Sequence, residues 1–311
     1  MRRVLVIKLG YSETLDNALS LTTSLGDVLR TTVILHFLKN DYIEWLVDKE
    51  AVPLLENNKY IRKLWIYSPN NLRLLKKKRF DVIINLEKSP DICLFLDCLT
   101  VKEYFGFRVD NINDRTHKYF GNKNRLIKLS YDLNKRKKNK DCWQKILARS
   151  LGRKWSGQPY ILGYRPKSKI KYDIGFNWTT SNKWSNKAWP KDYWHELGDL
   201  IQKKYSISWQ QGLNSLYEYI DWINSCRLII TADTLGLHLS LVLRKRVIAL
   251  FGPTSWREIY FYNLGSFLIP KASYRCIPCL KPYCDKKKQC MEYISPIEVK
   301  HRIEQEFKKI R

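Results

Sequence analysis

Short apolar runs alternate with helical patterns along most of this chain, and this alternation restricts the possible folds more than any other feature. Runs such as RVLVIKL, YIEWLVD and FDVIINL are rich in β-branched residues and predict buried strands. The segments between them carry apolar residues at helical spacing. Strands that alternate with helices are typical of β-α-β units, so the sequence predicts an α/β protein with parallel sheets.

The alternation occurs twice, which predicts two doubly wound domains. The stretch that follows YFGFRVD is polar and basic, and the segment YILGYRPKSKIK has no period and is predicted to be a linker. We therefore expect a first domain over residues 1–165 and a second over residues 166–296. A terminal amphipathic helix is expected over residues 297–311. Its apolar residues are Ile297, Val299, Ile303 and Phe307.

The chain is strongly basic, with 56 Lys and Arg against 30 Asp and Glu. Such a charge attracts anionic partners, but clusters such as RLLKKKRF and NKRKKNK are spread along the chain. Solvated faces of a lysine-rich protein, attachment to an anionic membrane or glycolipid, and nucleic-acid binding all remain open. No apolar run approaches the roughly 20 residues that span a bilayer, and the first residues lack a signal-peptide pattern. We expect a cytoplasmic protein, attached peripherally to the inner membrane.

Asp27 is the first candidate for a catalytic residue. It follows Gly26 in the segment SLGDVLRTT, at the first turn of a predicted helix. An acidic residue at this position can simply complement the helix dipole. The same turn lies where the strands of an α/β sheet end and ligands bind, so the carboxylate could instead serve as a general base.

A polar loop after a predicted strand supplies candidate ligand-binding residues in the second domain. The strand ends at Asn177, and the loop contains Thr179, Thr180 and Lys187 before Pro190 starts the next helix. Lys187 is either one of many surface lysines or a cation that meets a ligand at the edge of the sheet.

The segment CRLIITADTLGLHLSLVL places polar residues between a buried strand and a helix. Asp233, Thr234, Leu235, Gly236 and His238 lie at this junction. The start of a helix offers unpaired N–H groups and a positive dipole end, so an anion is the expected ligand. Thr234 could alternatively be a plain N-cap and His238 a packed helix residue.

Four of the eight cysteines are clustered in RCIPCLKPYCDKKKQC, as Cys276, Cys279, Cys284 and Cys290. The first pair has Cys-x-x-Cys spacing, and four thiolates suit zinc or iron. Disulfides are disfavoured in a reducing cytosol. Unligated thiols remain an alternative, because the second pair is more widely spaced than usual.

The segments SLGDVLRTT, NKAWP, ADTLGLHLSLVL and FGPTSWREIY together resemble glycosyltransferase family nine, the lipopolysaccharide heptosyltransferases. The resemblance implies a GT-B fold, with two Rossmann-like domains facing a central cleft. It implies that the first domain binds the acceptor and the second binds a nucleotide sugar, ADP-heptose or a related donor. It further implies inversion at the anomeric carbon, with no metal required for catalysis.

The resemblance also implies roles for individual residues. Asp27 matches the general base, Lys187 a pyrophosphate-contacting lysine, and Asp233, Thr234 and His238 the nucleotide-sugar loop. Leu235 stands where the family more often has glycine, which here follows as Gly236. Some relatives, the heptosyltransferases that modify autotransporters, carry cysteine-bound iron. Zinc or iron held by four cysteines would be structural, since four protein ligands leave no open position.

The sequence therefore predicts an inverting glycosyltransferase that moves heptose or a related sugar to lipopolysaccharide or another surface glycan. The expected partners are the nucleotide sugar, a glycan or glycolipid acceptor and an anionic membrane surface, without nucleic acid. A nucleotide-sugar epimerase of the same fold would need further acid and base groups, and the chain has only five His. A basic nucleic-acid-binding protein would bind oligonucleotides in a salt-sensitive way, without turnover.

Overall fold

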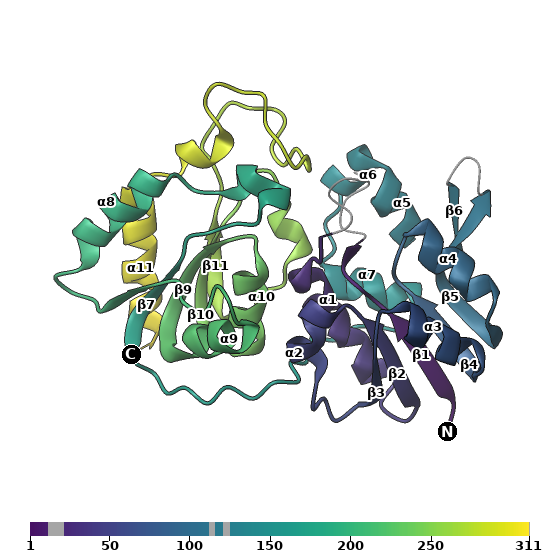
Figure 1. Ribbon diagram of the computed structural model, residues 1–311. Coiled ribbons are helices and arrows are strands. Elements are labelled where there is room, and N and C mark those ends of the chain that lie inside the picture. Colours follow the sequence, from purple (N-terminus) through teal and green to yellow (C-terminus); the bar gives the residue numbers. More distant parts are fainter. Residues whose placement is uncertain (12–21, 112–115, 121–124, 311) are drawn as a thin grey trace. The chain divides into compact units, whose positions relative to one another are not determined.

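The computed structural model describes residues 1–11, 22–111, 116–120 and 125–310. The chain divides into two compact units, Met1–Arg165 and Pro166–Arg311 (Figure 1). Each unit has a sheet of its own with helices packed on it. Within the described residues, every helix is too short or too polar to cross a lipid bilayer.

The N-terminal unit contains a six-stranded sheet in the order β3-β2-β1-β4-β5-β6. All neighbouring strands are parallel except β5 and β6, which are antiparallel. The strands are β1 (Arg3–Ile7), β2 (Tyr42–Val47), β3 (Ile61–Ile66), β4 (Arg79–Asn85), β5 (Thr100–Asn111) and β6 (Thr116–Phe120). The helices are α1 (Leu25–Thr31), η2 (Thr32–Phe37), η3 (Lys49–Ala51), α2 (Val52–Leu55), α3 (Pro69–Lys76), α4 (Pro90–Asp97), α5 (Arg125–Tyr131), α6 (Leu133–Lys137) and α7 (Trp143–Ser150).

The C-terminal unit contains a parallel five-stranded sheet in the order β11-β10-β9-β7-β8. The strands are β7 (Tyr172–Asn177), β8 (Ile207–Trp209), β9 (Cys226–Ala232), β10 (Arg246–Leu250) and β11 (Gly265–Leu268). The helices are η4 (Asn182–Lys187), α8 (Lys191–Ile201), α9 (Leu216–Ser225), α10 (Leu235–Val242), η5 (Trp256–Glu258), η6 (Cys290–Tyr293) and α11 (Pro296–Ile310).

Helices on the sheets are held by large apolar cores. In the N-terminal unit, Leu75 of α3 and Ile92 of α4 pack in one cluster with Leu5 and Ile83 of the sheet. Both helices therefore cover the same face of that sheet. Strand β1 is apolar almost throughout because a central parallel strand is buried on both faces.

The strand order locates a switch point in each unit. In the first, the chain leaves β1 toward β2 on one side and leaves β4 toward β5 on the other. In the second, β7 connects toward β8, whereas β9 connects toward β10. Ligands of doubly wound sheets bind beyond the carboxyl ends of the two strands at such a point. The residues after β1 and β4, and those after β7 and β9, are therefore the candidates for ligand binding.

The structure confirms the α/β class with parallel sheets and differs from the prediction in three segments. The basic stretch after β5 contains β6, α5 and α6, which its many charges concealed. The helix that begins at Leu25 changes to a 3-10 helix at Thr32, where the Thr31 and Thr32 hydroxyls donate to the carbonyls of Asp27 and Leu29. In α11, Ile297 is 44% exposed and does not belong to the buried apolar side.

Candidate functional site

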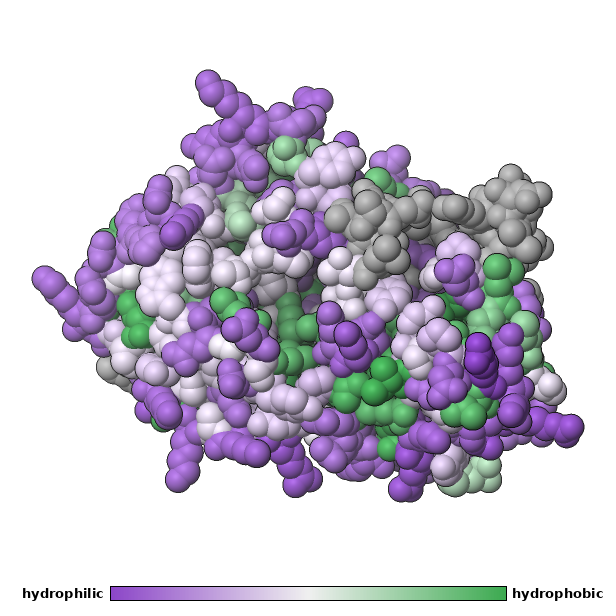
Figure 2. All heavy atoms as spheres, in the orientation of Figure 1, coloured by the Kyte–Doolittle hydropathy of each residue, from purple (hydrophilic) through white to green (hydrophobic). Residues whose placement is uncertain are grey.

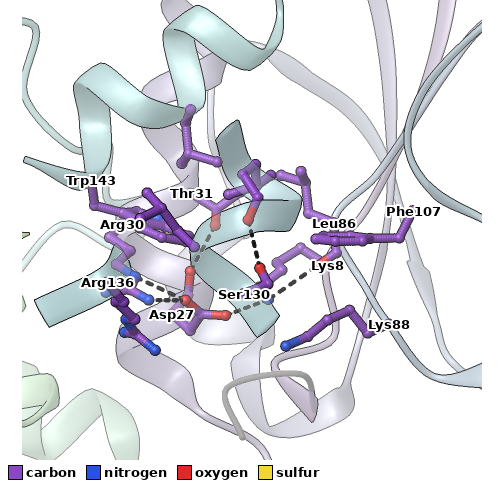
Figure 3. Close-up of a pocket in the computed structure, with 13 residues that line it drawn as sticks. Lys8, Asp27, Arg30, Thr31, Leu86, Lys88, Phe107, Ser130, Arg136 and Trp143 are labelled. Atoms are coloured by element: carbon purple, nitrogen blue, oxygen red, sulfur yellow. Dashed lines mark hydrogen bonds and ion pairs between the residues drawn. The ribbon is translucent and has the colours of Figure 1, made fainter. Parts of the chain in front are cut away.

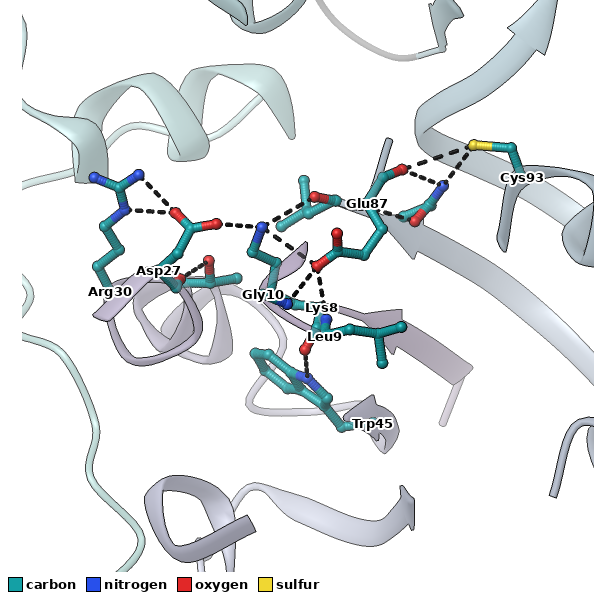
Figure 4. Close-up of polar contacts among 11 residues, drawn as sticks. Lys8, Leu9, Gly10, Asp27, Arg30, Trp45, Glu87 and Cys93 are labelled. Carbon is teal, nitrogen blue, oxygen red and sulfur yellow. Dashed lines mark hydrogen bonds and ion pairs between the residues drawn. The ribbon is translucent and has the colours of Figure 1, made fainter. Parts of the chain in front are cut away.

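A chain of buried charges crosses the switch point of the N-terminal unit. Lys8 directly follows β1, and its ammonium group forms an ion pair with the Asp27 carboxylate (Figure 4). Lys8 Nζ also lies 3.4 Å from Glu87 Oε1. On the other side of Asp27, Arg30 Nη2 lies 2.6 Å from Asp27 Oδ1. Arg30, Asp27, Lys8 and Glu87 thus alternate in charge from α1 to the end of β4.

Glu87 fixes the exit of β1 to the exit of β4. Its carboxylate accepts hydrogen bonds from the backbone N–H groups of Leu9, at 2.7 Å, and Gly10, at 2.6 Å. The Asn85 side chain donates to the Glu87 carbonyl at 3.0 Å and accepts from the Glu87 N–H at 3.0 Å. These bonds hold the backbone next to Lys8 in place.

The pairing determines the protonation of the two central groups. Burial favours the neutral acid at Asp27, but Lys8 and Arg30 outweigh it and hold the pKa of this carboxyl well below its ordinary value. Burial lowers the pKa of Lys8, yet Asp27 and Glu87 more than compensate and raise it overall. Asp27 is therefore a carboxylate, and Lys8 an ammonium, across the physiological range.

Asp27 lines a pocket within the N-terminal unit (Figure 3). Its polar wall includes the cations Lys8, Arg30, Lys88 and Arg136. The apolar wall is formed by Leu86, Phe107, Leu126, Leu129, Trp143 and Leu147. Burial, with repulsion from Lys8 and Arg136, lowers the pKa of Lys88 to about 8. A carboxylate among cations suits a ligand that carries a hydroxyl group together with negative charge.

A second site lies at the switch point of the C-terminal unit. Lys187, at the end of η4, is 7% exposed, and its Nζ donates to the Asp233 carbonyl at 3.0 Å. The same Nζ lies 3.6 Å from Asp233 Oδ2 and 4.6 Å from the centroid of the Trp184 ring. Lys187 is thus a buried cation held beside the start of α10, and the interpretation as an ordinary surface lysine is wrong.

Neutral hydrogen bonds hold the start of α10. Tyr219 Oη donates to Asn177 Oδ1 at 2.7 Å, and Asn177 Nδ2 donates to the hydroxyl oxygens of Thr231 and Thr234 at 2.7 and 3.0 Å. Position 236 requires glycine, because this network lies where the Cβ of any other residue would be. A Cβ there would lie 2.5 Å from Asn177 Nδ2 and 2.7 Å from Tyr219 Oη.

The backbone amides at this helix start are less available than the sequence suggested. Thr234 N donates to the Ala232 carbonyl at 2.8 Å, and Gly236 N donates to Thr234 Oγ1 at 3.2 Å. Thr234 is thus an N-cap, as the simpler interpretation held. Of the three described amides at positions 234, 235 and 236, the Leu235 amide therefore remains for a ligand. His238 lies one turn further along α10 and is buried.

Thr179 and Thr180 line a different hollow. Trp178, Lys191 and Gln289 also line it, whereas Lys187 and Asp233 do not. The Thr179 hydroxyl donates to Gln210 Oε1 at 2.6 Å. The structure therefore brings Lys187, Asp233, Thr234, Leu235 and Gly236 together, whereas the two threonines line the other hollow. Gly26 and Asp27 belong to the N-terminal unit.

The four clustered cysteines are half-buried and carry free thiols. Burial, with the nearby thiols of Cys279, Cys284 and Cys276, raises the pKa of Cys290 to about 12. The thiols therefore lie close enough to affect one another's ionisation. Among the described residues, however, no three His, Cys, Asp or Glu side chains are gathered as a metal-binding group.

Comparison with known proteins finds a match to the part of the chain that contains β9 and α10. Residues 212–289 match the profile of glycosyltransferase family 9 (heptosyltransferase). Lipooligosaccharide heptosyltransferase 2 of Campylobacter jejuni subsp. jejuni serotype O:2 is 31% identical over 75 residues, which cover 24% of this chain and 24% of that protein. The chain thus matches about a quarter of the length of this curated relative. The segment that matches family 9, residues 212–289, includes Thr231, Asp233, Thr234 and Gly236.

Solved structures extend the likeness to the whole chain. Escherichia coli heptosyltransferase WaaC with ADP aligns over 99% of this chain and 98% of its own, with a TM-score of 0.63 and 15% identity. The iron-containing heptosyltransferase TibC of enterotoxigenic E. coli, in complex with ADP-D-beta-D-heptose, covers 100% of this chain and 77% of its own. Its TM-score is 0.60, with 11% identity. The chain therefore has the GT-B fold.

Sequence reasoning missed several residues of both sites. Lys8 and Glu87 each follow an apolar strand, in RVLVIKLG and DVIINLEKSP, and this position after a strand was the available signal. Their pairing was not visible because it joins residues 78 or more positions apart. Tyr219 gave no signal, since aromatic residues at helical spacing normally belong to a core.

Proposed function

We propose that this protein is an inverting, heptosyltransferase-like glycosyltransferase that transfers a sugar, with ADP-heptose as the favoured donor, to lipopolysaccharide or another surface glycan. The site around α10 carries the proposal: its Asp233, Thr234 and Gly236 lie in the segment that matches family 9, and the buried Lys187 ammonium group lies beside Asp233. The curated relative is a lipooligosaccharide heptosyltransferase, and WaaC was solved with ADP. Both support a nucleotide-sugar donor and a glycan acceptor.

The C-terminal site would act on the leaving group. When a nucleoside diphosphate leaves the anomeric carbon, negative charge accumulates on the pyrophosphate and positive charge on the sugar. Lys187, the Leu235 amide and the positive end of the α10 dipole are placed to stabilise that negative charge. The hydrogen bond from Gly236 N to Thr234 Oγ1 caps the helix and holds its first turn in place.

The N-terminal site would act on the acceptor. Asp27 would take the proton from the acceptor hydroxyl as its oxygen attacks the anomeric carbon from the side opposite the leaving group, which inverts the configuration. Lys8 and Arg30 keep the carboxylate ionised and ready, but they also make it a weak base. Proton transfer therefore requires the acceptor to loosen these two ion pairs as it binds.

Donor binding tests the proposed function directly. A thermal-shift screen over ADP-, GDP-, UDP- and CDP-sugars should show stabilisation by one of them. A ligand at about 100 times its dissociation constant stabilises a protein by roughly 2.7 kcal/mol. The matching nucleoside monophosphate serves as the control, because it lacks the pyrophosphate that Lys187 would contact. If none of the four donors shifts the melting temperature, the transferase proposal fails.

We also infer that Cys276, Cys279, Cys284 and Cys290 hold one structural zinc or iron ion. The supports are the donor set, which both metals accept, and the iron of TibC. The thiols would have to converge on the ion, since they are not arranged as a ligand set. Elemental analysis of protein purified without added metal should give about one ion per chain. Absence of both metals, with four thiols free to titrate, would contradict the inference.

The charge of the chain further supports a place in the cytoplasm on the surface of the inner membrane. A net charge of +26 favours attachment to anionic lipid, which would bring the protein to a membrane-linked acceptor. Binding to anionic vesicles in preference to neutral ones is the expected result.

A further inference from the structure

The segment 57–80 carries positive charge without acidic residues between its cations. It holds eight Lys and Arg and no Asp or Glu. The eight are Lys59, Arg62, Lys63, Arg73, Lys76, Lys77, Lys78 and Arg79, and all but Lys78 are exposed. Within the described residues, none of them forms an ion pair. The segment contains β3 and α3, and we call its solvent side the β3–α3 face.

The cations of the strand and of the helix lie close together. Lys63 Nζ of β3 lies 3.9 Å from the centroid of the Trp65 ring, and Lys78 Nζ, just after α3, lies 5.2 Å from the same centroid. Leu75 is fully buried in the core, which turns Arg73, Lys76 and Lys77 toward solvent. Lys63 of β3 and Lys78 after α3 therefore lie beside the same ring, and Arg73, Lys76 and Lys77 extend the positive charge along α3.

Aliphatic side chains are exposed among these cations. Ile66, at the end of β3, is 44% exposed, and Leu74 of α3 is 43% exposed. Leu94, on the neighbouring α4, is also exposed. The part of the N-terminal unit that carries α3 and α4 shows hydrophobic patches between hydrophilic ones (Figure 2). Preventing aggregation between sheet edges could be the whole role of lysines on an edge strand such as β3. That role does not explain the cations or the exposed leucine of α3.

The other basic cluster of the same unit differs in its pairing. Around α6 and α7, Lys135 pairs with Asp132 at 3.0 Å, and Asp141 pairs with both Lys145 and Arg149 at 2.7 Å. Local carboxylates therefore pair with cations there, whereas the eight cations of segment 57–80 form no ion pair among the described residues. A basic surface with exposed aliphatic groups matches a bilayer, which offers anionic headgroups beside an apolar boundary. Nucleic acid offers phosphates without such a boundary.

We propose that the β3–α3 face is the surface by which this protein docks on an anionic lipid bilayer, with Lys76 and Lys77 at the headgroups and Leu74 at the acyl boundary. The proposal rests on the membrane attachment inferred above and adds the face that makes it. It does not depend on the sugar or the acceptor.

Co-sedimentation with vesicles tests the face. The wild-type chain should bind vesicles of equal parts phosphatidylglycerol and phosphatidylcholine, and bind pure phosphatidylcholine poorly. The double variant Lys76→Glu/Lys77→Glu should bind the anionic vesicles at least about 30-fold more weakly, at roughly fivefold for each lysine lost. The control, Lys203→Glu/Lys204→Glu, makes the same charge change at exposed lysines of the C-terminal unit and should bind several-fold more tightly than that variant.

A second pair of variants tests the apolar contact. Leu74→Ser should weaken vesicle binding by about threefold to fivefold, because half of a leucine side chain would leave the acyl boundary. Leu133→Ser, at an equally exposed leucine of α6, should have no effect. Melting temperatures near that of the wild type would show that all four variants fold.

The outcomes separate the two proposals. Equal binding of the wild type to neutral and anionic vesicles would overturn the membrane attachment itself. Preferential anionic binding that falls equally in both double variants would keep the attachment and overturn this face. If Lys76→Glu/Lys77→Glu instead abolishes binding to a duplex oligonucleotide and leaves vesicle binding intact, the face belongs to nucleic acid.

Discussion

The two candidate sites occupy equivalent places in their sheets but are built from different groups. Beyond β1 and β4, the site is ionic: Asp27, Lys8 and Glu87 are buried, and with the partly buried Arg30 they form a series of alternating charges. Beyond β7 and β9, it is neutral apart from Lys187 and Asp233. Tyr219, Asn177 and two threonines hold the start of α10 by hydrogen bonds between uncharged groups.

The difference corresponds to what each site would do in a transfer reaction. A general base must change its protonation, and a carboxylate between two cations changes its basicity whenever those cations move. A site for a leaving group needs donors in fixed positions, because charge develops there within one step. Neutral networks provide such positions without a strong dependence on pH. Four predictions test this contrast, beginning with the largest expected effect.

Asp27→Asn should lower sugar transfer by roughly 10² to 10⁴, the usual contribution of a positioned acid or base. The amide preserves the size of the side chain but cannot accept the acceptor's proton. Donor binding in calorimetry should remain, because Asp27 lies in the other unit from Lys187. Transfer is measured with saturating donor.

Glu87→Gln is the control for Asp27→Asn. It also removes a carboxylate from Lys8, but it leaves Asp27 in place. Transfer by this variant should fall much less, although stability should fall in both. An equal loss of transfer would mean that Asp27 acts only as a member of the ionic series.

Lys8→Met should lower the free energy of unfolding at pH 7 by about 3 to 5 kcal/mol, because Asp27 and Glu87 are left as buried carboxylates without their shared cation. The pKa of Asp27 is depressed in the folded state, so its pairing stabilises the protein above the unfolded pKa of about 3.9 and is lost as the pH falls through the folded pKa. The difference between wild type and variant should therefore narrow below about pH 4. Urea unfolding at pH 7, 5 and 3 measures it.

A constant difference at all three pH values would show that Lys8 contributes by packing and not by its charge. Lys76→Met, at an exposed lysine without an ion pair, is the matched control. It should change stability by less than about 0.5 kcal/mol at each pH.

The fold was largely predictable, whereas the contacts within the sites were not. Strand and helix positions follow from the periodicity of apolar residues, which is a local property of the sequence. Asp27 and Thr234 could be predicted as site residues because each lies at the start of a helix that follows a strand. Lys8 and Glu87 meet only after β1 pairs with β4, and a partner 78 or more residues away leaves no local pattern. The positions of Thr179 and Lys187 also depend on how their loop folds, since this loop contains η4, which ends at Lys187.

Lys187→Ala should weaken donor binding by about tenfold to a hundredfold, since a hydrogen bond to a charged group contributes about 1.5 to 3 kcal/mol. The control is Lys191→Ala, at an exposed lysine that lines the hollow with Thr179 and Thr180. Isothermal calorimetry with the donor compares the two. A larger loss for Lys191→Ala would move the donor into that hollow and restore the two threonines as donor contacts.

Tyr219→Phe has the smallest expected effect and is the closest test of the neutral network. The hydroxyl donates to Asn177, which in turn holds Thr234, so its removal should cost about 1 kcal/mol of stability and up to about fivefold in donor affinity. Burial raises the pKa of Tyr219, so the group stays neutral and the loss should be the same from pH 5 to pH 8. Tyr217→Phe, at an exposed position on α9, should change neither quantity. A loss that varied with pH in this range would show that the second site also depends on an ionising group, and the contrast between the two sites would fail.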